Sequence, residues 1–127
     1  MFEVGVRRKF TAFHQLIGGD WGAENAHHSH DYVLEIICRG DQLDRDEYLF
    51  DISVLEKHLE RLVDQYSGQS LNHLRGFEGR NPSVELFARV LAQELRPCLV
   101  DQPSLASFKV VLWEHAQAWA SFQTSLR

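Results

Sequence analysis

The chain has 127 residues, of which 13 are Lys or Arg and 18 are Asp or Glu, so that its formal net charge is −5. Hydrophobic residues make up 44% of the chain and charged residues 24%, a balance that is typical of a globular domain and argues against disorder. The length is that of a single domain, residues 1–127. An acidic chain of this kind lacks the clustered basic surface that nucleic-acid binding requires.

The sequence offers no sign of a membrane segment or of export. The longest apolar run, residues 32–38, is interrupted by Glu35 and is far shorter than the ~20 residues that span a bilayer. The first four residues lack the pattern of a signal peptide. Two cysteines, Cys38 and Cys98, are too few for a disulfide framework. We therefore expect a cytoplasmic protein with reduced thiols and no membrane partner.

The first half of the chain begins with predicted strands. Apolar and other residues alternate over residues 2–6, which predicts a half-buried strand that continues to His14. Several glycines and an asparagine over 16–26 predict a loop. A second strand, rich in Tyr, Val and Ile, follows over about 28–39, and residues 48–50 predict a short third strand.

Two helices are predicted in the middle of the chain. The first begins at Ser53, where Glu56 completes a capping box, and ends at Gly68. The second begins at Asn81 and is stopped by Pro97. Both segments carry apolar residues at helical spacing, which predicts one buried face for each helix.

Two more strands are predicted near the end, over 108–114 and 119–122. Strands, then helices, then strands predict an α+β fold, with an antiparallel β-sheet and two helices packed on one of its faces. The apolar helix positions, such as Leu55, Leu59 and Phe87, are expected to form the core between the layers.

Three histidines have spacings that suggest a metal site. His28 and His30 are two residues apart on a predicted strand, so their side chains point to the same face. His14 ends the preceding strand and lies beside them if the 15–27 loop joins the two strands as a hairpin. Three neutral imidazoles with an open fourth position describe a catalytic zinc site. The alternative is that His27, His28 and His30 are polar residues at a loop edge and bind no metal.

Glu114 is a second candidate. It continues the face of Val110 and Leu112, where a carboxylate is costly unless it is paired. One interpretation is an anchor that accepts paired hydrogen bonds from a ligand with adjacent N–H groups. The other is an exposed charge at the end of a strand.

These residues resemble the motifs of a known family. Phe10-Thr-Ala-Phe-His14 and His28-Ser-His30-Asp-Tyr32 are similar to the zinc-binding pattern of the 6-pyruvoyltetrahydropterin synthase / 6-carboxytetrahydropterin synthase family. Further similarities follow in the family's order along almost the whole chain, at Phe50-Asp51, Leu71-Asn72, Asn81-Pro82-Ser83-Val-Glu85 and Val110-Val-Leu-Trp-Glu114.

The resemblance implies a tunnelling-fold subunit, whose trimers close a β-barrel and stack in pairs into a hexamer with active sites at subunit interfaces. It implies Zn²⁺ on His14, His28 and His30, and a pterin substrate whose 2-amino-4-oxo edge meets the carboxylate of Glu114. Ser83 is a candidate for the pocket of the pterin ring. The implied reaction is that of a lyase on the side chain of 7,8-dihydroneopterin triphosphate, a substrate that the queuosine, folate and biopterin pathways share.

Three departures from the family pattern leave the activity open, the mildest of which is Ser29 in place of the glycine between the zinc histidines. Glu24 stands where the family has its catalytic cysteine, and Ser67 and Gly68 stand where it has an Asp-His proton relay. Cys38 and Cys98 are poorly placed to replace the missing thiol.

Two hypotheses follow. In the first, Glu24 is the general base, as in a branch of the family in which glutamate replaces the cysteine. His73 or Asp64 would then be candidates to replace the relay. In the second, the chain is a catalytically inactive module that binds zinc and a pterin.

An anionic substrate would also need local positive charge. The densest basic cluster is residues 7–9, and Arg75 and Arg80 are further candidates in a predicted loop. Solvated basic side chains at a strand edge explain the same residues equally well.

Overall fold

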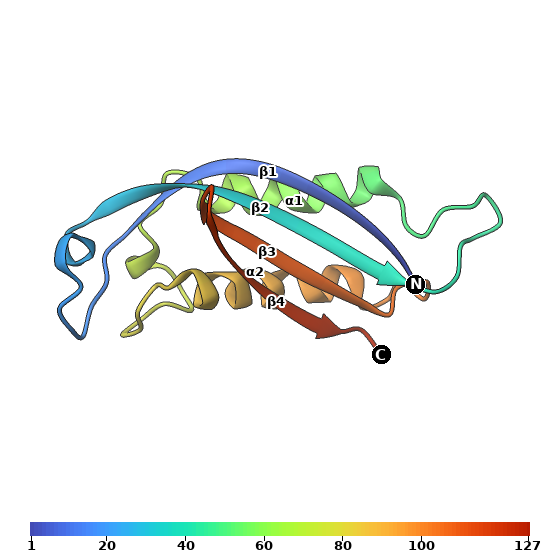
Figure 1. Cartoon of the computed structure of the whole chain (residues 1–127). Helices are drawn as coiled ribbons and strands as arrows, with labels where there is room; N and C mark the ends of the chain where they lie inside the picture. The colour runs from blue at the N-terminus through green and yellow to red at the C-terminus, as the bar shows by residue number, and fades with distance from the viewer.

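A four-stranded antiparallel sheet organises the chain in the computed structural model, which describes residues 1–127, and both helices pack against one of its faces (Figure 1). The strands follow one another across the sheet in chain order. They are β1 (Phe2–His14), β2 (His28–Gly40), β3 (Ser107–His115) and β4 (Ala118–Ser125), and the helices are α1 (Ile52–Tyr66) and α2 (Val84–Leu99). The predicted α+β architecture is confirmed. Neither helix has the length and apolar character needed to cross a membrane.

The core lies between the sheet and the two helices. Along β2, Tyr32, Leu34 and Ile36 are buried while the residues between them are more exposed, as alternating strand side chains require. α1 packs mainly on β1, and α2 packs on β3 and β4 (Figure 1). The predicted apolar stripes of both helices face the core between the helices and the sheet. The most buried residues of these stripes have no exposed surface.

Phe87 of α2 is the centre of an aromatic cluster. Its ring lies 6.0 Å from Phe10, 5.3 Å from both Tyr32 and Tyr66, and 5.7 Å from Phe77, measured between ring centroids. The cluster joins β1, β2, both helices and the loop between the helices. It therefore ties the sheet to its helical layer beside the ends of β1 and β2 that carry the histidines.

The predicted third strand is wrong. Residues 48–50 form no strand. The preceding turn is built by the Asp44 carboxylate, which accepts hydrogen bonds from the backbone N–H groups of Asp46 at 2.8 Å and Tyr48 at 3.0 Å. Leu49 and Phe50 are 4% and 8% exposed. These apolar residues cover the edge of the core from a loop, which explains their pattern without a strand.

The predicted start of the first helix is also wrong. Asp51 is the N-cap of α1, and its carboxylate accepts the backbone N–H of Ser53 at 2.9 Å and the Ser53 hydroxyl at 2.6 Å. These hydrogen bonds lower the pKa of Asp51. An aspartate placed before the first turn caps the helix better than the proposed box of Ser53 with Glu56, because its charge also favours the helix N-terminus. Gly68 follows the helix with φ 75°, as its predicted role as terminator requires.

The bounds predicted for the second helix need two corrections. Ser83 is the N-cap of α2 and accepts the backbone N–H of Leu86 at 3.1 Å, so the helix begins at Val84 and not at Asn81. Pro97 lies inside the last turn and does not stop the helix, which continues to Leu99. The missing N–H of a proline costs least near a helix end, where a single lost hydrogen bond does not break the remaining turns.

Replacement of Phe87 by alanine should destabilise the protein by about 3–5 kcal/mol, since a fully buried ring leaves a cavity among four aromatic neighbours. Denaturant unfolding measures the effect. Tyr48, which is 63% exposed, offers the matched control. An equal loss of stability in Tyr48→Ala would contradict the assignment of Phe87 to the core.

Candidate functional site

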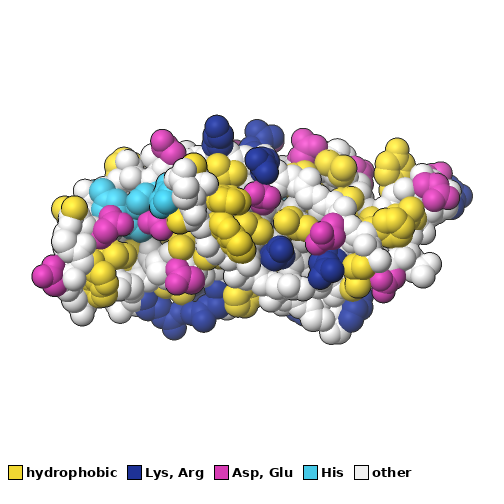
Figure 2. Space-filling view, viewed as in Figure 1, with side chains coloured by type: hydrophobic (Ala, Val, Ile, Leu, Met, Phe, Trp, Pro, Cys, Tyr) yellow, Lys and Arg dark blue, Asp and Glu magenta, His cyan; other side chains and the backbone are white.

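Three histidines lie together at the end of the sheet where β1 ends and β2 begins. The register places His14 opposite His28, and Ala12 opposite His30, so all three histidines share the face that the helices cover. The ring centroids are 4.6 Å apart for His14 and His28 and 4.8 Å apart for the other two pairs. Figure 2 shows histidine side chains gathered on one part of the surface, beside acidic ones. The sequence spacing predicted this proximity.

His14 is held in the form that binds metals. Its side chain is 2% exposed, and its Nδ1 lies 2.9 Å from the backbone oxygen of Pro82. Because a carbonyl oxygen only accepts, Nδ1 carries the proton and Nε2 keeps a free lone pair. That Nε2 is buried without any hydrogen-bond partner. Burial lowers the pKa of His14 to about 4, so its ring is neutral at pH 7.

His28 is oriented in the same way. Its Nδ1 lies 2.7 Å from the backbone oxygen of Ala26, which leaves Nε2 free to face the other rings. The Nε2 atoms of His28 and His30 are 3.1 Å apart. Two nitrogens bound at ~2.0–2.1 Å to one tetrahedral zinc stand about 3.4 Å apart, so the observed spacing fits such an ion within a few tenths of an ångström. The chemistry of the donor set therefore suits zinc, with two backbone carbonyls fixing the tautomers from outside.

Glu24 joins the same group. It lies in a short 3-10 helix, η1 (Gly22–Asn25), within the loop between β1 and β2. Its Oε2 is 2.6 Å from His28 Nε2, and its Oε1 is 3.9 Å from His30 Nε2. One ligand atom from each of His14, Glu24, His28 and His30 lies within 4.8 Å of the other three. The loop thus brings a carboxylate to the histidines, and the side chain remains 41% exposed.

Asn25 fixes the loop that carries Glu24. Its side-chain nitrogen donates to the backbone oxygens of Leu16 at 3.1 Å and Gly19 at 3.0 Å, and its side-chain oxygen accepts the backbone N–H of Trp21 at 2.7 Å. A backbone hydrogen bond from Leu16 N to Glu24 O, 2.8 Å long, closes the same loop. The position of Glu24 is therefore set by its neighbour and by the backbone.

Two further asparagines hold the start of this loop. Asn72 exchanges two hydrogen bonds of 2.9 Å with the backbone of Gln15, one in each direction. Asn81 accepts the backbone N–H of Ile17 at 2.6 Å. Both come from the segment between the helices, so residues far apart in sequence hold the chain directly after His14. Both asparagines belong to motifs that resemble the family, but nothing in the sequence predicts these contacts with the loop.

Glu114 approaches the histidines from β3. Its Oε1 is 2.9 Å from His30 Nε2 and 4.0 Å from His14 Nε2, and its side chain is 20% exposed. An irregularity in the pairing with β4 lies between Trp113 and His115, at Glu114 itself. Bulges of this kind re-aim a side chain. Glu114 therefore lies partly buried beside the histidine group, whereas the alternative interpretation predicted an exposed strand-end charge. Its role as an anchor for a ligand stays a prediction.

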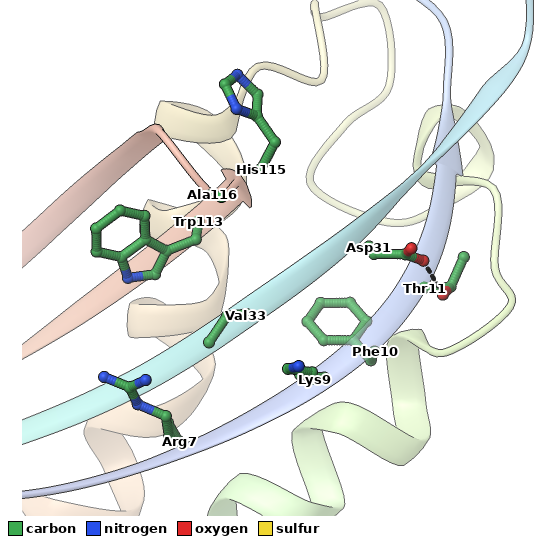
Figure 3. A pocket seen from close by; sticks show the side chains of 9 residues that line it. All are labelled: Arg7, Lys9, Phe10, Thr11, Asp31, Val33, Trp113, His115 and Ala116. Carbon is green, nitrogen blue, oxygen red and sulfur yellow. Dashed lines mark hydrogen bonds between the residues drawn. The ribbon is translucent and has the colours of Figure 1, made fainter.

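A groove of about 790 Å³ lies where β2 and β3 separate (Figure 3). Trp113 and His115 stand on one side of it, and Lys9, Thr11 and Asp31 on the other (Figure 3). The Thr11 hydroxyl donates to Asp31 at 2.7 Å. The remaining lining residues are Arg7, Phe10, Val33 and Ala116. None of the four grouped metal-ligand candidates lines this groove, although Asp31 directly follows His30 in the chain.

The basic residues are divided between the two faces of the sheet. Arg7 and Lys9 line the groove, where Arg7 lies 3.6 Å from Glu35. Arg8 points to the helical face and lies 3.8 Å from Glu60. Lys9 has no carboxylate within ion-pair distance and is therefore the member of this cluster with its charge free for a ligand.

Comparison with known proteins identifies the family. Residues 3–125 match the family model described as 6-pyruvoyl tetrahydropterin synthase. The chain belongs to the 6-pyruvoyl tetrahydropterin synthase family. No curated protein sequence matches the chain significantly.

Solved structures of family members have the same fold. The 6-pyruvoyl tetrahydropterin synthase of Caenorhabditis elegans aligns with a TM-score of 0.79 at 22% identity, over 98% of both chains. That of Plasmodium falciparum aligns with a TM-score of 0.78 at 15% identity, over 98% of both chains. A Plasmodium vivax variant, in which alanine replaces a glutamate described as a catalytic residue, aligns with a TM-score of 0.75 at 15% identity over 98% of both chains. The predicted tunnelling fold is confirmed.

The 6-pyruvoyl tetrahydropterin synthase-like chain holds no thiol near its histidines. Cys38 lies ten positions beyond His28 on β2, about 33 Å away at ~3.3 Å per residue. Cys98 lies at the end of α2, where Arg61 donates to its sulfur at 3.2 Å. Among the carboxylates, Glu24 and Glu114 reach the histidines, whereas Asp64 is not part of the group.

Ser83 and His73 are both predicted site residues, but neither is part of the histidine group. The Ser83 hydroxyl oxygen accepts from Leu86 at the start of α2, directly after the Pro82 that holds His14. The hydroxyl proton of Ser83 is therefore free to be donated to a ligand. His73 is exposed at the end of the 3-10 helix η2 (Leu71–His73) and is not part of the histidine group.

Alkylation should distinguish the two thiols. Burial raises the pKa of Cys38 to about 12, so its reactive thiolate is scarce at neutral pH, whereas Cys98 is partly exposed. Iodoacetamide at about pH 8 should therefore modify Cys98 alone in the native protein and both cysteines after denaturation. Peptide mass spectrometry measures both products. Native modification of Cys38 at the rate of Cys98 would contradict the burial assigned to it.

Proposed function

We propose that the protein is a zinc-dependent lyase that acts on the side chain of 7,8-dihydroneopterin triphosphate, with Glu24 as the general base. The observation that carries the proposal is the set of imidazoles, in which the buried Nε2 of His14 has no partner within the protein and faces two further ring nitrogens. A buried nitrogen of this kind is costly unless a ligand binds to it. Family membership supplies the reaction class.

His14, His28 and His30 would hold the zinc ion. When bound, zinc acts as a Lewis acid that polarises the hydroxyl groups of the substrate side chain and acidifies the adjacent carbon. The backbone oxygens of Pro82 and Ala26 keep the Nδ1 protons of His14 and His28 away from the metal. The protein's contribution is thus a set of three rings held close together, with the Nδ1 atoms of His14 and His28 turned away from the metal.

Glu24 is suited to accept the proton from the substrate side chain. Its carboxylate lies against the histidine group and is still 41% exposed, so that it reaches both the site and solvent. The Plasmodium vivax relative has a glutamate that is described as its catalytic residue, and we assign the same role to Glu24. A carboxylate positioned in this way contributes on the order of 10²–10⁴-fold to the rate.

Glu114 and Ser83 are proposed to bind the pterin ring. The Glu114 carboxylate has two oxygens, one of them 2.9 Å from His30, and suits the adjacent N–H groups of the ring as a bidentate acceptor. Ser83 keeps a free hydroxyl proton for a ring oxygen. Lys9 lies on the other face of the sheet from the histidines, so its charge would attract the triphosphate only at longer range.

We further propose a cytoplasmic homo-oligomer, a trimer or a hexamer, as the resemblance implies. The strand order leaves β1 and β4 as edge strands. Residues 68–70 cover the edge of β1 at Thr11 and Phe13, so the earlier part of β1 and β4 offer backbone groups for pairing with another copy. The order of the strands supports this assembly. The pathway served, whether queuosine, folate or biopterin, is a further proposal that depends on which product is formed.

A second candidate is a pterin- and zinc-binding module without activity. The observation in its favour is that Ser67 and Gly68 occupy the positions of the family's proton relay. A serine hydroxyl does not titrate near neutral pH and glycine has no side chain, so neither residue replaces an Asp-His pair as acid or base. A module of this kind would bind the pterin and leave it unchanged.

Mass spectrometry of the products distinguishes the two candidates. Zinc-loaded protein incubated with 7,8-dihydroneopterin triphosphate should yield a 6-carboxy, 6-pyruvoyl or 6-hydroxymethyl pterin. Unchanged substrate that nonetheless binds would contradict the lyase and favour the module.

Replacement of Glu24 by glutamine should reduce turnover at least about 100-fold, because the amide keeps the shape of the side chain but cannot accept a proton. Circular dichroism should show an unchanged fold. Glu56→Gln, at an exposed position on α1, is the matched control and should keep full turnover. Full turnover in Glu24→Gln would exclude Glu24 as the base.

A further inference from the structure

We infer that Glu24 closes the fourth position of the metal site in the substrate-free protein, so that the resting site has three imidazoles and one carboxylate. The inference rests on the metal site of the proposed function and assigns to the same carboxylate a resting role in addition to that of base. The ligand atoms of Glu24 and the three histidines lie within 4.8 Å of one another, so that small movements of the side chains bring all four to one metal ion.

The contact between Glu24 and His28 requires a cation or a proton. Because the Nδ1 of His28 donates to Ala26, its Nε2 presents a lone pair to the Glu24 oxygen 2.6 Å away. Two acceptors at this distance repel each other unless something positive lies between them. The Nε2 atoms of His14 and His30 face the same space. A single metal ion satisfies all four groups, whereas one proton satisfies only a pair.

Glu114 is less suited to the fourth position. Its Oε1 approaches His30 at 2.9 Å but lies 4.0 Å from His14, and Glu114 is not part of the four-residue group. It is also carried by a strand, whereas Glu24 lies in a loop and is 41% exposed. The loop carboxylate can therefore leave the metal when a substrate binds, while Glu114 stays in place for the ring. Only after leaving is the Glu24 carboxylate free to accept a proton.

Cobalt(II) provides a test that does not depend on turnover. Tetrahedral cobalt absorbs visible light in a way that changes with its ligands, and competition with a chelator measures the affinity. Glu24→Gln and Glu24→Ala should weaken cobalt binding at least about 10-fold, since even residues outside the first shell are worth roughly 10–100-fold. Both variants should also change the visible spectrum. The comparison variant, Glu114→Gln, should change the affinity and the spectrum less than either Glu24 variant, because its carboxylate lies close to His30 alone.

The outcomes of the cobalt experiment distinguish the assignment of Glu24 as fourth ligand from the proposed function. Unchanged affinity and spectrum in both Glu24 variants would overturn the fourth-ligand assignment and leave the three-histidine site intact. An equal or larger effect in Glu114→Gln would also overturn it, because the carboxylate in the fourth position would then not be specific to Glu24. Failure of the unmodified protein to bind cobalt or zinc would instead overturn the metal site itself.

Discussion

The antiparallel register of β1 and β2 is the constraint on which the candidate site depends. Side chains alternate along a strand, so a slip of one residue would turn His28 and His30 to the uncovered face of the sheet, away from His14. The register is held by apolar contacts on the covered face. Phe10 lies opposite Tyr32, their rings stack at 5.3 Å, and Phe87 packs against both. Burial of the core thus also fixes the relative positions of the histidines.

Polar contacts fix the loop between β1 and β2, whereas apolar burial fixes the strands. The segment between β1 and β2 has no fully buried residue to anchor it. Asn72 and Asn81 fix the backbone directly after His14, and Asn25 fixes the part that carries Glu24. Glu24 is therefore held through its backbone while its side chain is 41% exposed, which suits the two roles that we propose for it, as a ligand and as a base. A rigid strand position such as that of Glu114 suits a single role.

The sequence predicts the strands, the helical stripes and the histidine group well, because each follows from a periodicity that one buried face imposes. Prediction from the sequence fails where a single loop interaction outweighs the local pattern of apolar and capping residues. Asn81 is predicted to start the second helix, yet its side-chain oxygen accepts a hydrogen bond from the backbone N–H of Ile17. The carbonyl of Pro82, which sets the tautomer of His14, is a backbone group and has no sequence signature. Residues 48–50 are apolar like a strand but cover the core from a loop.

We propose that the register of β1 and β2 places His14, His28 and His30 around one metal ion. Crystallography of zinc-loaded protein, with anomalous data collected at the zinc absorption edge, tests it most directly. We expect a single anomalous peak within bonding distance of the Nε2 atoms of His14, His28 and His30, and none in the groove beside Trp113. A peak elsewhere, or a zinc ion bound through Nδ1 of His14, would contradict it.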